Sequence, residues 1–275
     1  GSTHQRLGAS LAEEMDAEFC GVVNRHFPDG ERYIRVLMDV NEQDVVVVQN
    51  TFPDKKIVEL LLILQAVKEA GAKTVTCVIP YMGYSRQERI FQSGEARSAK
   101  AIASVIGGMC DRVFTINVHT PEILKFFGCE ANDINGSREV VRYLKGFGPD
   151  MVIAPDEGSR DRCTLAADLL KVPVHVMKKV RIDGRTVETS SGQINVKGST
   201  AVILDDIIST GGTIATAANI LREGGAERVF AACTHGLFIE DAANRLRVCD
   251  DILSSDTLEG VYTRFSVAPA IADAL

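Results

Sequence analysis

Two adjacent carboxylates and a glycine pair lie close together in the second half of the chain. The run AVILDDIISTGGT (201–213) places Asp205 and Asp206 directly after an apolar triplet typical of a buried strand. Carboxylates accept hydrogen bonds from sugar hydroxyls, glycines let the backbone approach a ligand, and N–H groups at a helix start bind phosphate. The run predicts a ribose 5-phosphate pocket rather than a turn with surface acids, because two carboxylates after a buried triplet are costly without a ligand or solvent. The expected phosphate-binding turn is Ser209, Thr210, Gly211, Gly212 and Thr213.

A second motif with ligand-binding potential is RHFPDGERYIRV (25–36). Asp29 and Gly30 mark a turn, which on its own favours a hairpin. Phe27, together with Asp29 and Glu31, presents one aromatic face and two acceptors at that turn.

The segment IPYMGYSRQERI (79–90) ends an expected strand and then delivers Arg86, Gln87 and Arg89. Guanidinium groups at a strand end suit a polyphosphate, because their donors pair with phosphate oxygens. A solvated basic patch is the alternative that this stretch leaves open.

Two potential metal donors stand at the ends of expected strands. His119 follows RVFTINV, and Asp156 ends MVIAPD. A lone His is more often structural than a ligand, but the strand end beside Thr120 and Pro121 favours a metal or phosphate role. The two donors predict Mg²⁺ beside a nucleotide phosphate. His235, which ends the expected strand 228–235, is not predicted to bind a metal or a phosphate.

Two cations stand at the start of the polar segment 181–198, which lacks an apolar face: Lys179 two residues before it, and Arg181 as its first residue. Alternation along a strand places them on the same face. The segment predicts a hairpin or mobile loop, on which two cations would stabilise charge that develops during phosphoryl transfer. Taken alone, the motif favours two solvated cations on an edge hairpin.

Short β-rich runs alternate with helical patterns nearly throughout, which predicts an α/β fold of parallel sheets flanked by helices. The expected strands are 44–50, 73–81, 112–118, 151–156, 173–179, 201–206, 228–235 and 250–256. The expected helices are 55–72, 98–109, 121–128, 162–170 and 213–225. Ligands of such folds bind at the carboxyl ends of strands, where the candidate residues stand.

An internal echo indicates two similar domains. DRVFTINVHT (111–120) and ERVFAACTHG (227–236) share Arg-Val-Phe, followed by a His at the same spacing. The match fits two α/β domains of similar build, with a boundary near residue 136.

The composition is that of a soluble globular chain of 275 residues with a formal charge of −7. This acidic balance makes nucleic acid and an anionic membrane poor partners. No apolar run is long enough to span a bilayer. The seven Cys include no Cys-x-x-Cys, which indicates buried free thiols and a cytoplasmic location.

Taken in order, the motifs resemble the ribose-phosphate pyrophosphokinase family over nearly the whole chain. They are FPDGE, GYSRQER, NVH, APD, KKVR, LDDIISTGGT, THGLF and SVAPAIADAL. LDDIISTGGT is similar to the phosphoribosyl-pyrophosphate motif of the phosphoribosyltransferase superfamily, with Ser209 where many relatives carry an acid. The length and INVHTPEIL resemble the archaeal type. Because the family begins with a strand before GS, the resemblance favours N-terminal disorder or truncation here.

The resemblance implies two phosphoribosyltransferase-like domains: an ATP-binding domain over 1–136, with 266–275 as a candidate addition, and a ribose-5-phosphate-binding domain over 137–265. It implies Mg²⁺-dependent transfer of the diphosphoryl group of ATP to the anomeric hydroxyl of ribose 5-phosphate, by a homo-oligomer (a dimer or a multiple of it) that shares its adenine site between subunits. The implied ATP ligands are Phe27, Asp29, Gly30, Glu31, Arg86, Gln87 and His119. The implied metal contacts are His119 and Asp156, and the implied catalytic cations are Lys179 and Arg181. The implied sugar-phosphate ligands are Arg181, Asp205, Asp206, Ser209, Thr210, Gly211, Gly212 and Thr213.

Two other functions remain open. A phosphoribosyltransferase shares 202–213 but has one such domain and no need of FPDGE with SRQER. A non-catalytic regulatory relative would keep the fold and sense nucleotides. The presence of Lys179, Arg181, His119 and Asp156 disfavours it.

Overall fold

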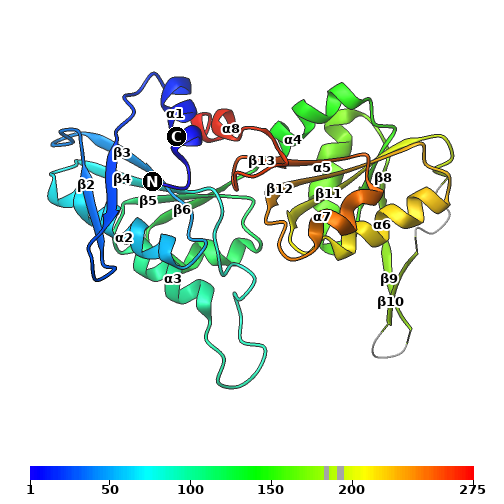
Figure 1. Cartoon of the computed structure of the whole chain (residues 1–275), viewed down its shortest axis with the longest axis horizontal. Helices are drawn as coiled ribbons and strands as arrows, with labels where there is room; N and C mark the ends of the chain where they lie inside the picture. Colours follow the sequence, from blue (N-terminus) through cyan, green and yellow to red (C-terminus); the bar gives the residue numbers. More distant parts are fainter. Residues whose placement is uncertain (183–185, 191–194) are drawn as a thin grey trace. The chain divides into compact units, whose positions relative to one another are not determined.

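The structure, a computed structural model, describes residues 1–182, 186–190 and 195–275, without the side chains of 178–182 and 186–190. The chain forms two compact units, Gly1–Asn135 with Ala268–Leu275, and Gly136–Val267. The C-terminal tail returns to the first unit through α8 (Ala268–Ala272), which packs against α1 (Gln5–Glu14), as Figure 1 shows.

The first unit is built on a parallel sheet in the order β3-β4-β5-β6. Its strands are β3 (Asp44–Val48), β4 (Thr74–Ile79), β5 (Arg112–Ile116) and β6 (Glu130–Ile134). Its crossover helices are α2 (Lys55–Glu69), α3 (Ser98–Gly107) and the 3₁₀ helix η1 (Pro121–Phe126). The β-branched runs of β3 and β4 favour strands, and the apolar faces of α2 and α3 cover them in one core.

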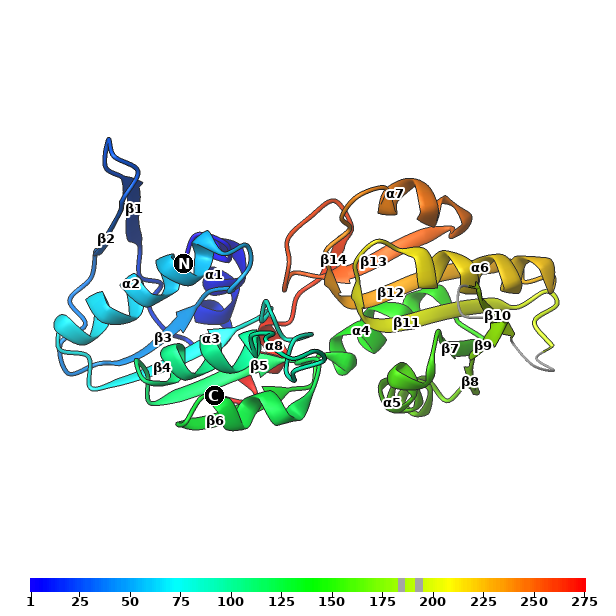
Figure 2. The same ribbon diagram turned by 90° about the horizontal axis from the view of Figure 1, so that it is seen from below.

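An antiparallel hairpin of β1 (Val22–His26) and β2 (Arg32–Val36) extends from this unit, which confirms the hairpin expected over 25–36 (Figure 2). Glu59, fully buried on α2, holds its base through an ion pair of 3.3 Å with Arg32. Both carboxylate oxygens of Glu59 also accept hydrogen bonds from Ser2 at 2.8 Å. Ser2 is therefore hydrogen-bonded to the body of the unit.

The second unit is built on a parallel sheet in the order β14-β13-β12-β11-β7-β8. Its strands are β7 (Met151–Ala154), β8 (Val174–Val176), β11 (Thr200–Ile208), β12 (Arg228–Gly236), β13 (Asp251–Ser255) and β14 (Thr263–Phe265). Its longer helices are α4 (Ser137–Leu144), α5 (Arg160–Leu170) and α6 (Gly212–Glu223). Its short helices are η2 (Lys145–Phe147), η3 (Glu157–Ser159), α7 (Ala242–Arg245) and η4 (Leu246–Val248).

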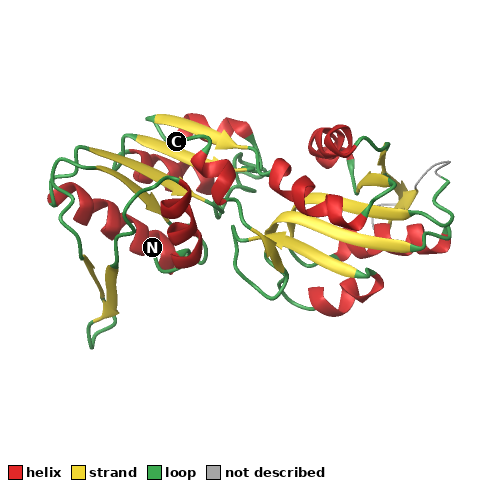
Figure 3. Cartoon of the chain, turned by 90° about the horizontal axis from the view of Figure 1, so that it is seen from above, coloured by secondary structure: helices red, strands yellow, loops and turns green. Residues whose placement is uncertain are grey.

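Helices cover both faces of this second sheet, as Figure 3 shows. Apolar side chains of α4 and α5 pack on one face with Val202 and Leu204 of β11. Those of α6 pack on the other face with Ala201 and Ile203. Residues 201–204 are all buried because helices cover both faces of the sheet. This part of β11 is therefore apolar at every position, rather than alternating between apolar and polar residues.

A separate antiparallel ribbon pairs β9 (Lys178–Ile182) with β10 (Thr186–Ser190). The hairpin expected over 181–198 is present in its described part and begins earlier than the sequence suggested. The single strand expected over 173–179 is instead two strands, β8 and β9, separated at Met177.

The two halves of the sequence echo occupy matching places. Arg112 opens β5 and donates to Thr76 of the neighbouring strand at 3.1 Å. Arg228 opens β12 and donates to Thr200 of its neighbouring strand at 3.2 Å. The repeated contact supports the internal duplication that the sequence indicated.

The predicted α/β class and parallel sheets are confirmed, and several elements differ in detail. Helix 121–128 is a 3₁₀ helix that begins at Pro121, and the strand expected at 112–118 ends at Ile116. Strand β6 was missed, because EANDI has a single strongly apolar residue. Within the described ranges no helix has the length and apolarity to cross a membrane, and all seven Cys are free thiols.

Candidate active site

Asp205 and Asp206 lie inside β11 rather than at its last two positions, where the expected strand 201–206 placed them, because pairing with β12 continues to Ile208. Their side chains are 16 % and 7 % exposed. A buried pair of carboxylates in mid-strand is not the turn with surface acids that was the alternative. Each carboxylate also accepts from the next backbone N–H, at 2.9 Å in both cases.

Arg162, which the sequence analysis did not single out, lies against both acids. Its Nη1 is 3.1 Å from Oδ1 of Asp205 and 3.2 Å from Oδ1 of Asp206. Ser159, almost fully buried, donates to the same Oδ1 of Asp205 at 2.7 Å. Both residues follow Asp156 at the amino-terminal end of α5, so the loop after β7 reaches the acids of β11.

Burial raises the pKa of Asp205 to about 7, with the neighbouring charge of Asp206 as the second cause. The Ser159 hydrogen bond and the Arg162 charge act in the opposite direction and favour the ionised form. The acid pair therefore retains a proton close to neutral pH when no ligand neutralises it.

Asp156 stands beyond the carboxyl end of β7 and precedes η3. The hydroxyl of Ser159 is 3.3 Å from its Oδ1, so one serine contacts both Asp156 and Asp205. The candidate metal ligand and the candidate sugar ligand are thus neighbours in the second unit.

Residues 209–213 form the expected turn into a helix. Gly211 adopts φ +75° as the residue before α6, a left-handed conformation that favours glycine. A Cβ at Gly211 would lie 3.0 Å from Leu246, so a side chain there is also crowded. The amino-terminal N–H groups of α6 face the turn without intrahelical partners, which suits a phosphate.

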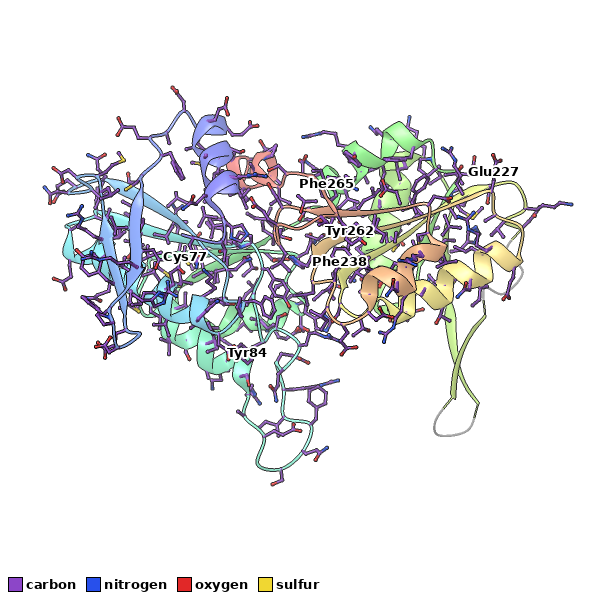
Figure 4. The ribbon with its side chains drawn as sticks, viewed as in Figure 1. Cys77, Tyr84, Glu227, Phe238, Tyr262 and Phe265 are labelled. Carbon is purple, nitrogen blue, oxygen red and sulfur yellow. The ribbon has the colours of Figure 1, made fainter. Side chains whose placement is uncertain are left out.

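The segment after β12 supports this turn. Arg245 donates to the carbonyl of Thr210 at 3.0 Å, and the N–H of Ile239 donates to the carbonyl of Ser209 at 3.1 Å. Phe238 packs on Tyr262 with ring centroids 4.7 Å apart (Figure 4). A Cβ at Gly236 would lie 2.2 Å from the Phe238 ring, so this packing requires glycine there.

The corresponding strand-end loop of the first unit follows β4. Gly83 approaches the end of β3 closely: its N–H donates to Thr51 Oγ1 at 2.7 Å, and a Cβ would lie 2.8 Å from the Thr51 carbonyl oxygen. Tyr84, labelled in Figure 4, has φ +64° and donates to Asp54 at 2.6 Å. That hydrogen bond raises the pKa of Tyr84. These contacts fix the start of the loop that carries Arg86 and Gln87.

The two predicted nucleotide ligands of this loop differ in their surroundings. Arg86 is exposed. Gln87 accepts a hydrogen bond from Ser98 at 2.9 Å and thereby joins the loop to the start of α3. His119 is exposed in the loop after β5, beyond the strand end where the sequence placed it.

The structure does not bring the hairpin tip to these loops within the first unit. Phe27 is 45 % exposed at the tip, next to Gly30 with φ +94°. Asp29 accepts from the N–H of Glu31 at 3.0 Å. Figures 1 and 2 both show the hairpin at one end of this unit, away from the loop after β4.

Lys179 and Arg181 lie in β9, two residues apart, where they pair with Thr189 and Val187 of β10. Their side chains lie outside the described residues. Among the side chains that are described, no three His, Cys, Asp or Glu form a metal-binding group. Mg²⁺ that is held by one or two carboxylates, substrate phosphates and water needs no such group, so Asp156 suits it.

Sequence reasoning missed Ser159 and Arg162 because GSRDR offers no distinctive pattern. Ser159 and Arg162 both stand near the start of α5. Arg160 lies in the same turn, but among the contacts described its one ion pair is with exposed Glu157. Only the contact of Arg162 with the acids of β11 distinguishes it from Arg160.

Comparison with known proteins is consistent across both units. Residues 1–109 match the N-terminal domain of ribose phosphate pyrophosphokinase, and residues 135–267 match the phosphoribosyl transferase domain. The ribose-phosphate pyrophosphokinase of Methanopyrus kandleri is 39 % identical over 98 % of this chain and 95 % of its own. That of Methanothermobacter thermautotrophicus is 39 % identical over 100 % of this chain and 98 % of its own. The crystal structure of phosphoribosylpyrophosphate synthetase from Mycobacterium smegmatis superposes with a TM-score of 0.86 at 29 % identity, covering 100 % of this chain and 95 % of that chain.

Proposed function

The chain belongs to the ribose-phosphate pyrophosphokinase family, and from this membership we propose that it transfers the diphosphoryl group of ATP to the anomeric hydroxyl of ribose 5-phosphate. The products are 5-phosphoribosyl 1-pyrophosphate and AMP. The resemblance stated from the sequence motifs is confirmed by these relatives.

The observation that carries the assignment is the second unit's sugar-phosphate site. Buried Asp205 and Asp206 adjoin a turn whose Gly211 is left-handed and whose helix start presents backbone N–H groups. Carboxylates accept from ribose hydroxyls, and the N–H groups bind the 5-phosphate. In this proposal the sugar phosphate binds to Asp205, Asp206, Arg181 and residues 209–213.

The nucleotide is assigned to the first unit. The fixed loop after β4 presents Arg86 and Gln87, and the loop after β5 presents His119. Arginine suits polyphosphate because its planar donors pair with phosphate oxygens. A phosphoribosyltransferase has no need of such a unit, and residues 1–109 match the N-terminal domain of ribose phosphate pyrophosphokinase.

The remaining roles follow from the charge that develops in diphosphoryl transfer. Lys179 and Arg181 are proposed as the cations that stabilise this charge, which involves positioning and electrostatics rather than a covalent nucleophile. His119 and Asp156 are the proposed contacts of Mg²⁺, which neutralises phosphate oxygens when bound. Asp205 and Asp206 orient the sugar so that its anomeric hydroxyl meets the phosphorus in line.

We also propose that the adenine site is completed by a second copy of the chain. Phe27, Asp29 and Glu31 are exposed at the hairpin tip, remote from the nucleotide loops of their own unit. A mixture of Phe27→Ala and Arg86→Ala chains tests this, since shared sites regain one intact pair per mixed dimer. Activity in the mixture well above that of either variant supports the shared site, and a mixture no more active than its components contradicts it.

The activity itself is tested by AMP release from ATP with Mg²⁺, with and without ribose 5-phosphate, read by phosphorus NMR. We expect AMP and phosphoribosyl pyrophosphate in equal amounts, and only when the sugar phosphate is present. AMP release that ignores the sugar contradicts the assignment. No release by folded protein supplied with Mg²⁺ favours a regulatory relative.

A further inference from the structure

We propose that Arg162 is a positioning residue of the sugar-phosphate site, whose guanidinium holds Asp205 and Asp206 in the orientation that receives the ribose hydroxyls. The proposal rests on the proposed function, and it adds a residue that neither the sequence motifs nor the family resemblance singled out.

The first argument is geometric. Adjacent residues of a strand point to opposite faces, yet one nitrogen of Arg162 lies within 3.2 Å of an oxygen on each acid. The register with β12 is the same on both sides of the pair, Asp205 with Cys233 and Ile207 with His235. The N–H groups of Asp206 and Ile207 also donate to the side chain of the preceding residue. The cation thus draws together two carboxylates that strand geometry would separate.

The second argument is electrostatic. Two neighbouring carboxylates repel each other strongly where water is largely excluded, and an unpaired buried charge is expensive. Arg162 is itself 21 % exposed, so its charge is little screened by solvent. Oδ1 of Asp205 accepts from Arg162, Ser159 and a backbone N–H, which leaves that oxygen fully engaged. In our proposal the sugar therefore approaches the other carboxylate oxygen.

The third argument is the connection to Asp156. Ser159 is 2.7 Å from Asp205 and 3.3 Å from Asp156, and Arg162 is 3.5 Å from the same hydroxyl. One turn of chain thus fixes the proposed metal ligand and the proposed sugar ligands together. Arg162 acts through the acids, so its loss affects sugar binding rather than nucleotide binding.

The chain contains a matched control. Arg160 lies two residues away on α5, but its partner Glu157 is 73 % exposed and Arg160 is 49 % exposed. Such a surface pair contributes little. Arg160→Gln therefore changes the same residue type on the same helix without touching the acids.

The test compares Arg162→Gln, Arg162→Lys and Arg160→Gln in the full-length protein. Calorimetric titration gives the Kd for ribose 5-phosphate and, separately, for ATP, and steady-state assays give kcat and both KM values. We expect Arg162→Gln to weaken ribose 5-phosphate binding by about tenfold or more, with ATP binding unchanged. Arg162→Lys restores part of the affinity, because its ammonium keeps the charge but not the guanidinium geometry. Arg160→Gln binds both ligands like the wild type.

Two results overturn the proposal. One is a wild-type Kd for ribose 5-phosphate in folded Arg162→Gln, or in Arg162→Lys if the Gln variant does not fold. The other is an equal loss of affinity for ATP and sugar phosphate, which would indicate general structural damage. If the wild type binds ribose 5-phosphate and the Arg162 variants bind it with the same Kd, only the role of Arg162 is refuted. A wild type that does not bind ribose 5-phosphate refutes the proposed function, and this role with it.

Discussion

Replacing Asp205 by Asn should make the protein more stable, and increasingly so as the pH rises. In the folded chain the pKa of Asp205 is raised from 3.8 to about 7, by burial and by the charge of Asp206. The folded state therefore holds a proton that the unfolded state has released between these two pH values. Stability consequently falls as the pH rises through this window. Asparagine is neutral throughout and its oxygen still accepts from Ser159 and Arg162.

The magnitude follows from the same values. A pKa that is about three units higher in the folded than in the unfolded state lowers the free energy of unfolding by about 4 kcal/mol at most, at pH values above the folded-state pKa. The side chain is 16 % exposed, and partial solvent access reduces the effect. Between pH 5 and pH 8 we expect the advantage of Asp205→Asn to grow by about 2 kcal/mol and to level off above pH 7.

The assay is urea unfolding followed by circular dichroism, in EDTA and without ligands, at four pH values from 5 to 8. Asp161→Asn serves as the control, because it removes an exposed carboxylate from α5. Parallel stability profiles for wild type and Asp205→Asn across this range would refute the reasoning. So would an advantage of the Asn variant that shrinks as the pH rises.

Two further predictions concern the scaffold. Glu59→Gln should lower the free energy of unfolding by about 3 kcal/mol in urea titrations, because it leaves Arg32 without its buried counter-charge; an unchanged midpoint would contradict this. Gly211→Ala should cost about 1 to 2 kcal/mol through its positive φ and its contact with Leu246. Gly212→Ala is the control, since its Cβ meets nothing nearer than 4.0 Å, and equal unfolding midpoints for the two variants would oppose the account.

The fold class could be predicted because alternating β-rich and helical runs constrain an α/β architecture. The acid pair was placed at a strand end because two charges usually terminate a buried strand. The following Ile207 and Ile208 were the signal that β11 continues, and inside the strand both acids contact the Arg162 guanidinium.

Tertiary contacts account for what the sequence could not give. Arg162 and Asp205 are 43 residues apart, and no local pattern distinguishes Arg162 from Arg160. The anchoring of the hairpin base likewise depends on Glu59, which helical spacing places on the buried face of α2, four residues before Ile63, but whose partner Arg32 no local pattern indicates. In both cases a buried charge finds its partner on a distant element, which is a property of packing rather than of spacing.

The most direct test of the central claim is an experimental structure of the full-length protein with ribose 5-phosphate bound. The account predicts the 5-phosphate on the backbone N–H groups of residues 210–213 and the ribose hydroxyls on Asp205 and Asp206, with Arg162 still in contact with both acids. A sugar phosphate seated elsewhere, with the acid pair untouched, would contradict it.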